Sequence, residues 1–358
     1  MDKPQFIGLA PLWPWPLSRW HWWAAPVRAE RLAALRIGLA LLLLIDVLTT
    51  YLPNATLFFG DDSFAPPGSW DWRRQVEPPD HWPPSSWNDV QEQWNKPPER
   101  WYWSALYHVA DHRVIYLAVA AWAVALVGLL LGFCTRLNAV VVWILSTSFA
   151  NLNTNIDNAG DLVRGITLFY LMLSPCGATW SVDAWLRGRK GLVVISPWAL
   201  RLLFLQMVCI YWCNGLHKTI GDDWQQGKAL YFVLGDLTLA RLSYARSPLP
   251  VEWTYQFTRL LSWFVLTWEV TLPLLLIWRP IRRIALVFGA LFHIGILCSM
   301  EIGFFPAYML CLYLPLLPWE YLTDRLAKKT ASASVQPGTA PAVDPIKSAG
   351  RESAFRQQ

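Results

Sequence analysis

Long apolar runs separated by short polar turns dominate the chain from residue 33 to residue 320. A helix of about 20 apolar residues is long enough to cross the hydrocarbon core of a bilayer. About eight runs meet or approach that length. They cover residues 33–52, 114–133, 137–155, 162–175, 198–216, 259–278, 283–300 and 303–320. The pattern therefore predicts an all-α polytopic membrane protein, a bundle of about eight transmembrane helices.

Basic residues predict the orientation of this bundle, because cytoplasmic turns carry an excess of Lys and Arg. The basic segments are both ends of the chain and the turns after the second, fourth and sixth runs. They contain Lys3, Arg19, Arg28, Arg31, Arg136, Arg187, Arg189, Lys190, Arg279, Arg282, Arg283, Lys328 and Lys329. The turn 152–161 has no Lys or Arg. An even number of spans places all basic segments on one side, so we expect both termini to be cytoplasmic.

Three regions follow from this pattern. Residues 1–32 form a cytoplasmic N-terminal segment, and 33–325 form the transmembrane domain. Residues 326–358 are rich in Ala, Ser and Pro, which predicts a disordered cytoplasmic tail. After the first run, residues 53–113 contain seven Trp and four Pro-Pro pairs. Pro prevents a long helix and Trp favours the membrane interface, so we expect an extracytoplasmic loop on the membrane surface or over the bundle.

Composition supports a membrane protein and argues against nucleic-acid binding. Hydrophobic residues make up 54% of the chain, charged residues only 15%, and there are 24 Trp. The net charge of +5 is small, and the basic residues lie in turns and at the ends. Cys209 and Cys213 share a helical face, but other ligands do not cluster with them, so we expect core residues and no metal site.

The fifth run ends in residues that could do chemistry. Gly215, His217 and Lys218 close it, and Asp222 and Asp223 follow. An amine at a membrane boundary is partly desolvated, which disfavours the ammonium form and makes Lys218 a candidate base. A charged imidazole of His217 beside Lys218 would also disfavour its ammonium form. Equally, Lys residues at the ends of spanning helices often only mark the interface, and the spacing leaves both interpretations open.

Ionisable residues inside apolar runs are expensive and need partners. For Asp46 and Arg164 we favour mutual pairing that fixes helix contacts. Glu269 and His293 lie near the middle of consecutive runs, on the side where Lys218 emerges. Converging titratable groups are a default hypothesis for a functional site. The hypothetical shared site consists of Lys218, His293, Glu269, Asn158 and Asp161.

The order and spacing of several motifs resemble those of the vitamin K-dependent γ-carboxylases and their bacterial relatives, the horizontally transferred transmembrane domain (HTTM) proteins. The matching segments are 36–46, 131–136, 180–183, 215–227 and 292–305. The resemblance extends over most of the region between residues 30 and 320. It implies a helical membrane domain in a bacterial cytoplasmic membrane.

The resemblance also implies an activity. In this family a Lys amine deprotonates a reduced quinone, and the anion reacts with O₂ to give a stronger base. That base removes a γ-proton from a substrate Glu, and CO₂ adds to the carbanion. By this carry-over Lys218 is the base, and His293 holds or polarises the quinone. The implied partners are the lipid bilayer, a membrane quinone and a protein Glu substrate, and the candidate cofactor contacts are His217, Glu269, Asn158 and Asp161.

One departure and one alternative accompany this hypothesis. Animal members have a His where this chain has Gly160, so that function is absent or is supplied by His217 or Asp161. The lipase maturation factors have similar helical bundles, but their function is not described as carboxylation. A non-enzymatic assembly or maturation factor, or an inactive homologue, is therefore the alternative. Oxygen consumption with a reduced quinone distinguishes an enzyme from a scaffold.

Overall fold

The computed structural model describes residues 25–60, 63, 103–153, 156, 158–189, 191–243, 250–277 and 279–334. Most of the Trp- and Pro-rich loop, Asp157 and the chain after residue 334 lie outside these described residues. The chain divides into two compact units, residues 1–319 and 320–358. The second unit holds most of α16 (Trp319–Ser334), so residues 326–334, expected as the start of a disordered tail, are helical.

Each predicted apolar run contains a helix. The longer helices are α2 (Glu30–Asp46) with a π-helical continuation (Val47–Tyr51), α6 (His112–Leu131), α7 (Thr135–Leu152), α8 (Ala159–Leu173), α10 (Trp198–Lys218), α13 (Val251–Leu275) and α14 (Arg279–Ser299). Short helices are α3 (Ala55–Phe58), α9 (Val182–Leu186), α11 (Asp222–Gln225), α12 (Ala229–Gly235), α15 (Phe305–Cys311) and a 3-10 turn (Leu314–Leu316). A two-residue antiparallel ladder joins β1 (Val27–Arg28) to β2 (Val194–Ile195).

Within the described ranges, four helices are long and apolar enough to cross a membrane. They are Glu30–Tyr51, His112–Leu131, Trp198–Lys218 and Pro280–Ser299. The eighth predicted run differs, because α15 and the 3-10 turn form only a short apolar segment, Phe305–Leu316. Twelve residues of helix extend about 18 Å, against a hydrocarbon core of about 30 Å. Pro315 lies in the 3-10 turn that ends the segment, where an α-helix cannot continue normally.

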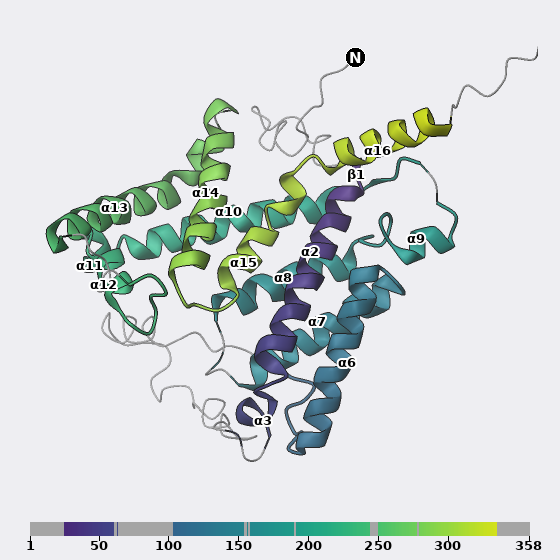
Figure 1. Cartoon of the computed structure of the whole chain (residues 1–358), viewed down its shortest axis with the longest axis horizontal. Coiled ribbons are helices and arrows are strands. Elements are labelled where there is room, and N and C mark those ends of the chain that lie inside the picture. The colour runs from purple at the N-terminus through teal and green to yellow at the C-terminus, as the bar shows by residue number, and fades with distance from the viewer. Residues whose placement is uncertain are drawn as a thin grey trace, which may run out of the picture. The chain divides into compact units, whose positions relative to one another are not determined.

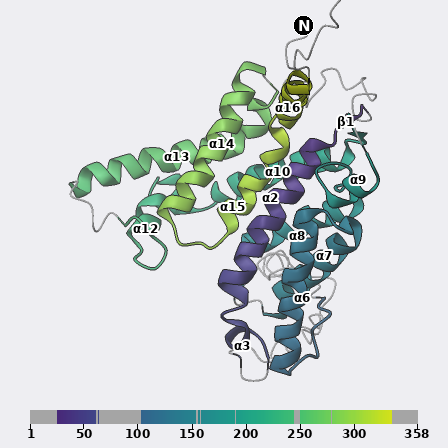
Figure 2. The same ribbon diagram turned by 45° about the vertical axis from the view of Figure 1, so that its right-hand side comes forward.

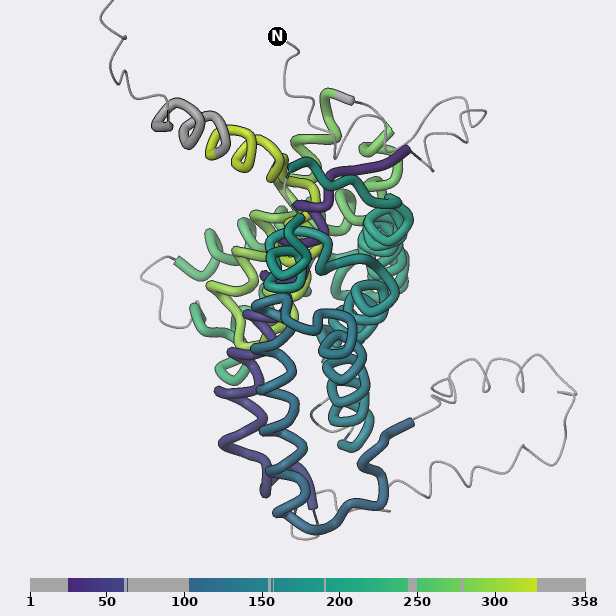
Figure 3. Tube along the Cα trace, turned by 90° about the vertical axis from the view of Figure 1, so that its right-hand side faces the viewer, coloured from purple at the N-terminus to yellow at the C-terminus, as the bar shows by residue number. Residues whose placement is uncertain are grey.

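The first unit contains two groups of helices joined by α15 (Figure 1). In the first group α2 packs against α6, α6 against α7, and α7 against α8. Figure 3 shows α2 and α6 running side by side. In the second group α13 packs against both α10 and α14 (Figure 2). The short helix α15 contacts α2 and α8 of the first group and α14 of the second.

Local sequence explains where α6 begins and ends. The Asp111 side chain accepts a hydrogen bond from the Arg113 backbone at the start of the helix. Gly132 ends it with a φ of 69°, a left-handed conformation that glycine adopts without strain. A Cβ at this position would collide with the guanidinium of Arg36 and with Ser181. The glycine is therefore required both by the backbone turn and by close packing.

Two segments of the resemblance, 131–136 and 180–183, meet at this turn and are joined by hydrogen bonds. The Asp183 carboxylate accepts hydrogen bonds from the backbone of Cys134 (2.9 Å) and Thr135 (2.8 Å), and from the Thr135 hydroxyl (2.7 Å). Arg36 donates to the carbonyl oxygens of Leu129 and Trp180. These contacts tie α2, the α6–α7 turn and α9 together. The 131–136 and 180–183 segments therefore support the fold.

Candidate functional site

The end of α10 and the middle of α13 meet in an ion pair. Lys218 Nζ donates to both carboxylate oxygens of Glu269, at 2.7 Å and 2.6 Å. The Glu269 side chain is 4% exposed and that of Lys218 is 22% exposed. Lys218 Nζ also lies 4.7 Å from the ring centroid of Trp224 in α11. Lys218 and Glu269, two residues of the hypothetical shared site, are therefore in contact, with the carboxylate inside the bundle and the amine at its edge.

A glycine one turn before Lys218 allows this contact. A Cβ on Gly215 would lie 2.8 Å from the backbone nitrogen of Val270 and 2.9 Å from Cβ of Glu269. Both distances are shorter than ordinary van der Waals contact. The α10 and α13 backbones thus approach closely at Gly215, as small residues permit between membrane helices. This approach places Lys218 within reach of Glu269.

His293 in α14 is a buried polar residue. It is 2% exposed, and neither ring nitrogen has a hydrogen-bond partner among the residues that the structure describes. Its ring packs against Tyr211, Phe292 and Phe305, with centroid distances of 5.6, 5.3 and 5.7 Å. Buried polar atoms are nearly always paired, so these two nitrogens are an exception among the residues that the structure describes. A neutral imidazole can donate from one nitrogen and accept at the other.

Lys218 and His293 are connected through one face of α10. Tyr211, Gly215 and Lys218 are spaced four and three residues apart, which places them on the same side of the helix. Tyr211 touches His293 at one end of this face, and Lys218 lies seven residues further, about 10 Å along the axis. The structure therefore aligns His293, the Gly215 contact and the Lys218–Glu269 pair along the junction of α10 with α13 and α14.

His217 does not share this face. It is exposed, and consecutive helical residues point in directions about 100° apart. His217 therefore lies on a different face of α10 from Lys218, and its contact with a cofactor stays a prediction. Among the described residues, no group of three or more His, Cys, Asp or Glu side chains is arranged to hold a metal ion.

Asn158 and Asp161 form the start of α8. Asn158 Oδ1 accepts from the Gly160 backbone and Asp161 Oδ2 accepts from the Asn158 backbone, both at 2.8 Å. These bonds are part of a capping box for the helix N-terminus. Asp161 Oδ1 lies 2.6 Å from Nη2 of Arg164. Asn158 and Asp161 therefore bond within the α8 cap, and their place in one site with Lys218 stays a prediction.

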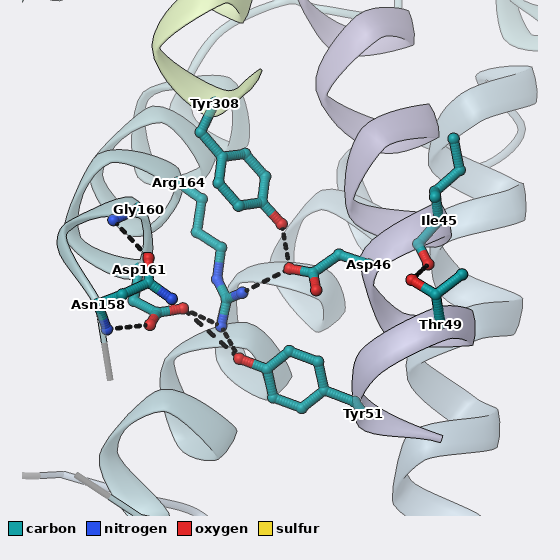
Figure 4. A network of polar contacts seen from close by, with 9 residues as sticks. All are labelled: Ile45, Asp46, Thr49, Tyr51, Asn158, Gly160, Asp161, Arg164 and Tyr308. Atoms are coloured by element: carbon teal, nitrogen blue, oxygen red, sulfur yellow. Dashed lines mark hydrogen bonds and ion pairs between the residues drawn. The ribbon is translucent and has the colours of Figure 1, made fainter. Parts of the chain in front are cut away.

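Arg164 is the centre of this second cluster, which Figure 4 shows. Its guanidinium lies 3.3 Å from the Asp46 carboxylate and donates to the Tyr51 hydroxyl at 2.7 Å. Tyr308 in α15 donates to the same Asp46 oxygen at 2.6 Å. The expected pairing of Asp46 with Arg164 is confirmed. This network joins α2, α8 and α15 through side chains that are almost fully buried.

Gly160, at the start of α8, has no room for a side chain. A Cβ on Gly160 would lie 3.0 Å from both Cα of Phe305 and Cδ2 of Tyr308. Helix α15 therefore packs directly against the first turn of α8. A larger residue at 160 would push these helices apart.

Two residues near His293 were missed by sequence reasoning. The Tyr211 hydroxyl lies 2.8 Å from that of Tyr313, so two aromatic side chains of α10 and the α15 region share a hydrogen bond inside the bundle. A Cβ on Gly289 would collide with the Tyr313 hydroxyl, which places this pair against α14. The only available signal was a Tyr within an apolar run, which is too common to identify a site.

Comparison with known proteins agrees with the membrane architecture. The family model described as the HTTM domain matches residues 80–318, well over half of the chain. This range contains the Lys218–Glu269 pair, His293, Arg164 and Tyr308. No solved structure matches the chain. Together with the four apolar helices, this match shows that the chain is an integral membrane protein and belongs to the HTTM family.

Proposed function

We propose that this protein is a membrane enzyme that uses a reduced quinone, with Lys218 as base, for carboxylation that depends on O₂ and CO₂ or for related redox chemistry. The observation that carries the proposal is the environment of the buried His293 imidazole. Within the described part of the chain its two buried ring nitrogens have no partner, and its ring touches the same α10 face that ends at Lys218.

The residues around His293 fit a quinone. A quinone is a planar ring with oxygen substituents, and binding sites for such groups combine apolar walls with a few polar atoms. Tyr211, Phe292 and Phe305 supply aromatic walls, and His293 supplies a donor and an acceptor. When bound, a reduced quinone would provide the ionisable hydroxyl and the electrons for reaction with O₂.

Lys218 and Glu269 would hold and move the proton. Lys218 acts as a base only when its Nζ has lost a proton. Glu269 Oε1 and Oε2 lie within hydrogen-bond distance of Nζ, so the proton can pass directly to the carboxylate. This transfer leaves a neutral amine and a neutral acid. Because burial disfavours charged forms, the low dielectric around Glu269 lowers the cost of that exchange.

We also propose the finer topology: about eight membrane segments, with both termini cytoplasmic in a bacterial inner membrane. Support comes from α7, α8 and α13, which pack among the four long apolar helices. Helix α13 alone has 25 residues. Reporter enzymes active only outside the cytoplasm, fused near Gly221 and near Gly188, test the orientation. Activity at Gly188 and not at Gly221 would invert it.

The activity is tested by oxygen uptake in lipid nanodiscs supplied with reduced menaquinone and bicarbonate. Wild type should consume O₂, and Lys218→Arg should not, because Arg keeps the charge and cannot act as a base near neutral pH. Lys228→Arg is the matched control, since Lys228 lies ten residues away and bonds Gln226. Equal uptake by wild type and Lys218→Arg would refute Lys218 as the base.

A second candidate function is a non-enzymatic assembly or maturation factor. The observation that favours it is the ion pair itself, because Lys218–Glu269 also pins α10 to α13. A scaffold of this kind would show no quinone-dependent oxygen uptake in any variant. It would also tolerate Lys218→Arg, since Arg pairs well with a carboxylate.

A further inference from the structure

Trp268 of α13, the residue before Glu269, is another buried polar group without a partner among the described residues. It is 5% exposed, and its indole Nε1 has no acceptor within the described ranges. An unpaired N–H inside a membrane bundle is costly, because no water is there to accept it. This N–H therefore needs an acceptor that the described residues do not provide.

Trp268 and His293 lie on the same aromatic cluster. The Trp268 ring is 4.9 Å from Tyr211 and 5.8 Å from Phe292, measured between centroids. His293 packs against these same two rings. The orphaned indole N–H and the orphaned imidazole nitrogens thus flank shared neighbours, although they come from different helices.

The Tyr211 hydroxyl, the polar group of the ring that touches both residues, is hydrogen-bonded elsewhere. Tyr211 touches both Trp268 and His293, but its hydroxyl oxygen is 2.8 Å from that of Tyr313. Gly289 allows the Tyr313 hydroxyl to approach α14 closely enough for this contact. Neither hydroxyl bonds Trp268 or His293, whose nitrogens have no partner among the described residues.

We propose that Trp268 is a quinone-binding residue that donates its Nε1–H to a ring oxygen of the quinone. This inference rests on the proposed function and extends it to a residue on α13. An indole N–H is a donor only, so it recognises an acceptor oxygen and not the apolar ring or tail. Trp268 would then determine how strongly the site distinguishes an oxygen-bearing ring from a plain aromatic hydrocarbon.

Equilibrium dialysis of the full chain in detergent micelles tests this role with two probes. Menadione carries the ring oxygens, and methylnaphthalene has a similar shape without them. Wild type should bind menadione more tightly than methylnaphthalene. Trp268→Phe should weaken menadione binding about tenfold, the size of one lost hydrogen bond, and leave methylnaphthalene binding unchanged.

Trp122 supplies the matched control. It is fully buried and its indole N–H also lacks a partner in the part of the chain that the structure describes, but its ring packs on Tyr51 and Phe149. Trp122→Phe should leave both affinities unchanged. If Trp268→Phe does not fold, benzothienylalanine at position 268 removes the N–H and keeps the bicyclic shape.

The outcomes separate the inference from the function on which it rests. Unchanged menadione binding in the position 268 variant, or equal weakening of both probes, would overturn the role of Trp268 and leave the proposed function standing. If wild type does not bind menadione, the proposed function fails and the inference fails with it. Selective loss of menadione binding supports both.

Discussion

The Lys218–Glu269 pair allows a quantitative prediction of stability. Two unit charges about 4 Å apart interact by about 4 kcal/mol at an effective dielectric constant of 20. Removing one partner of a buried pair costs about 3–5 kcal/mol, because the remaining charge is left uncompensated. The Glu269 side chain is buried, whereas the Lys218 side chain is partly exposed. We therefore expect Lys218→Ala to cost about 3 kcal/mol and Glu269→Gln about 1–2 kcal/mol.

A double-mutant cycle measures the interaction itself. In the double variant neither charge remains, so its cost should fall short of the summed single costs by about 2 kcal/mol. The free energy of unfolding is measured by titrating nonionic micelles with a denaturing detergent and following helicity by circular dichroism. Single costs that add to within about 0.5 kcal/mol would refute the pair as a stabilising contact.

Three further variants probe the Gly215 contact, the Asp183 contacts and the Arg164 cluster. Gly215→Leu should separate α10 from α13 and destabilise the bundle by about 1–3 kcal/mol in the same unfolding titration, whereas Gly165→Leu, where a Cβ meets nothing within 4 Å, should stay within about 0.5 kcal/mol of wild type. Partial burial opposes ionisation of Asp183, but hydrogen bonds from Thr135 and its neighbour hold the pKa of that carboxyl below its ordinary value. Its contribution is therefore complete above about pH 4 and is lost as the pH falls further, so thermal unfolding midpoints of wild type and Asp183→Asn should differ at neutral pH and converge in acid. Tyr308→Phe removes a donor from a buried carboxylate and should cost about 1–3 kcal/mol by chemical unfolding, and an unchanged value would contradict the network in Figure 4.

Hydropathy predicted the positions of the helices because each one must satisfy its backbone hydrogen bonds within an apolar run. It predicted helix length less well. The run 303–320 was counted as a full span, yet α15 ends at Cys311 and Pro315 lies in a separate 3-10 turn. Averaged hydropathy does not register these local breaks. Likewise, an apolar average gives no indication that Gly215 lets two backbones approach each other.

The cost of burying charge predicted that polar residues of the spans find partners. A carboxylate in a membrane span needs a partner, and this argument placed Glu269 in one site with Lys218, which it contacts. The same argument assigned Asp161 to that site. Asn158 and Asp161 are three residues apart before an apolar run, which is also the pattern of a helix cap, and the structure has them in such a cap. Trp268 was missed because one Trp among 24 has no distinguishing signal in the sequence.

The two polar clusters are distinct, yet α15 touches both. Phe305 packs against His293, and Tyr308, one turn later on the same helix, donates to Asp46. The Arg164 cluster has two carboxylates for one guanidinium, so the Tyr308 hydroxyl shares in stabilising the excess negative charge. A seven-residue helix moves as a unit, because its few turns are connected by backbone hydrogen bonds. Helix α15 therefore contacts both the aromatic cluster around His293, through Phe305, and the buried charge network around Arg164, through Tyr308.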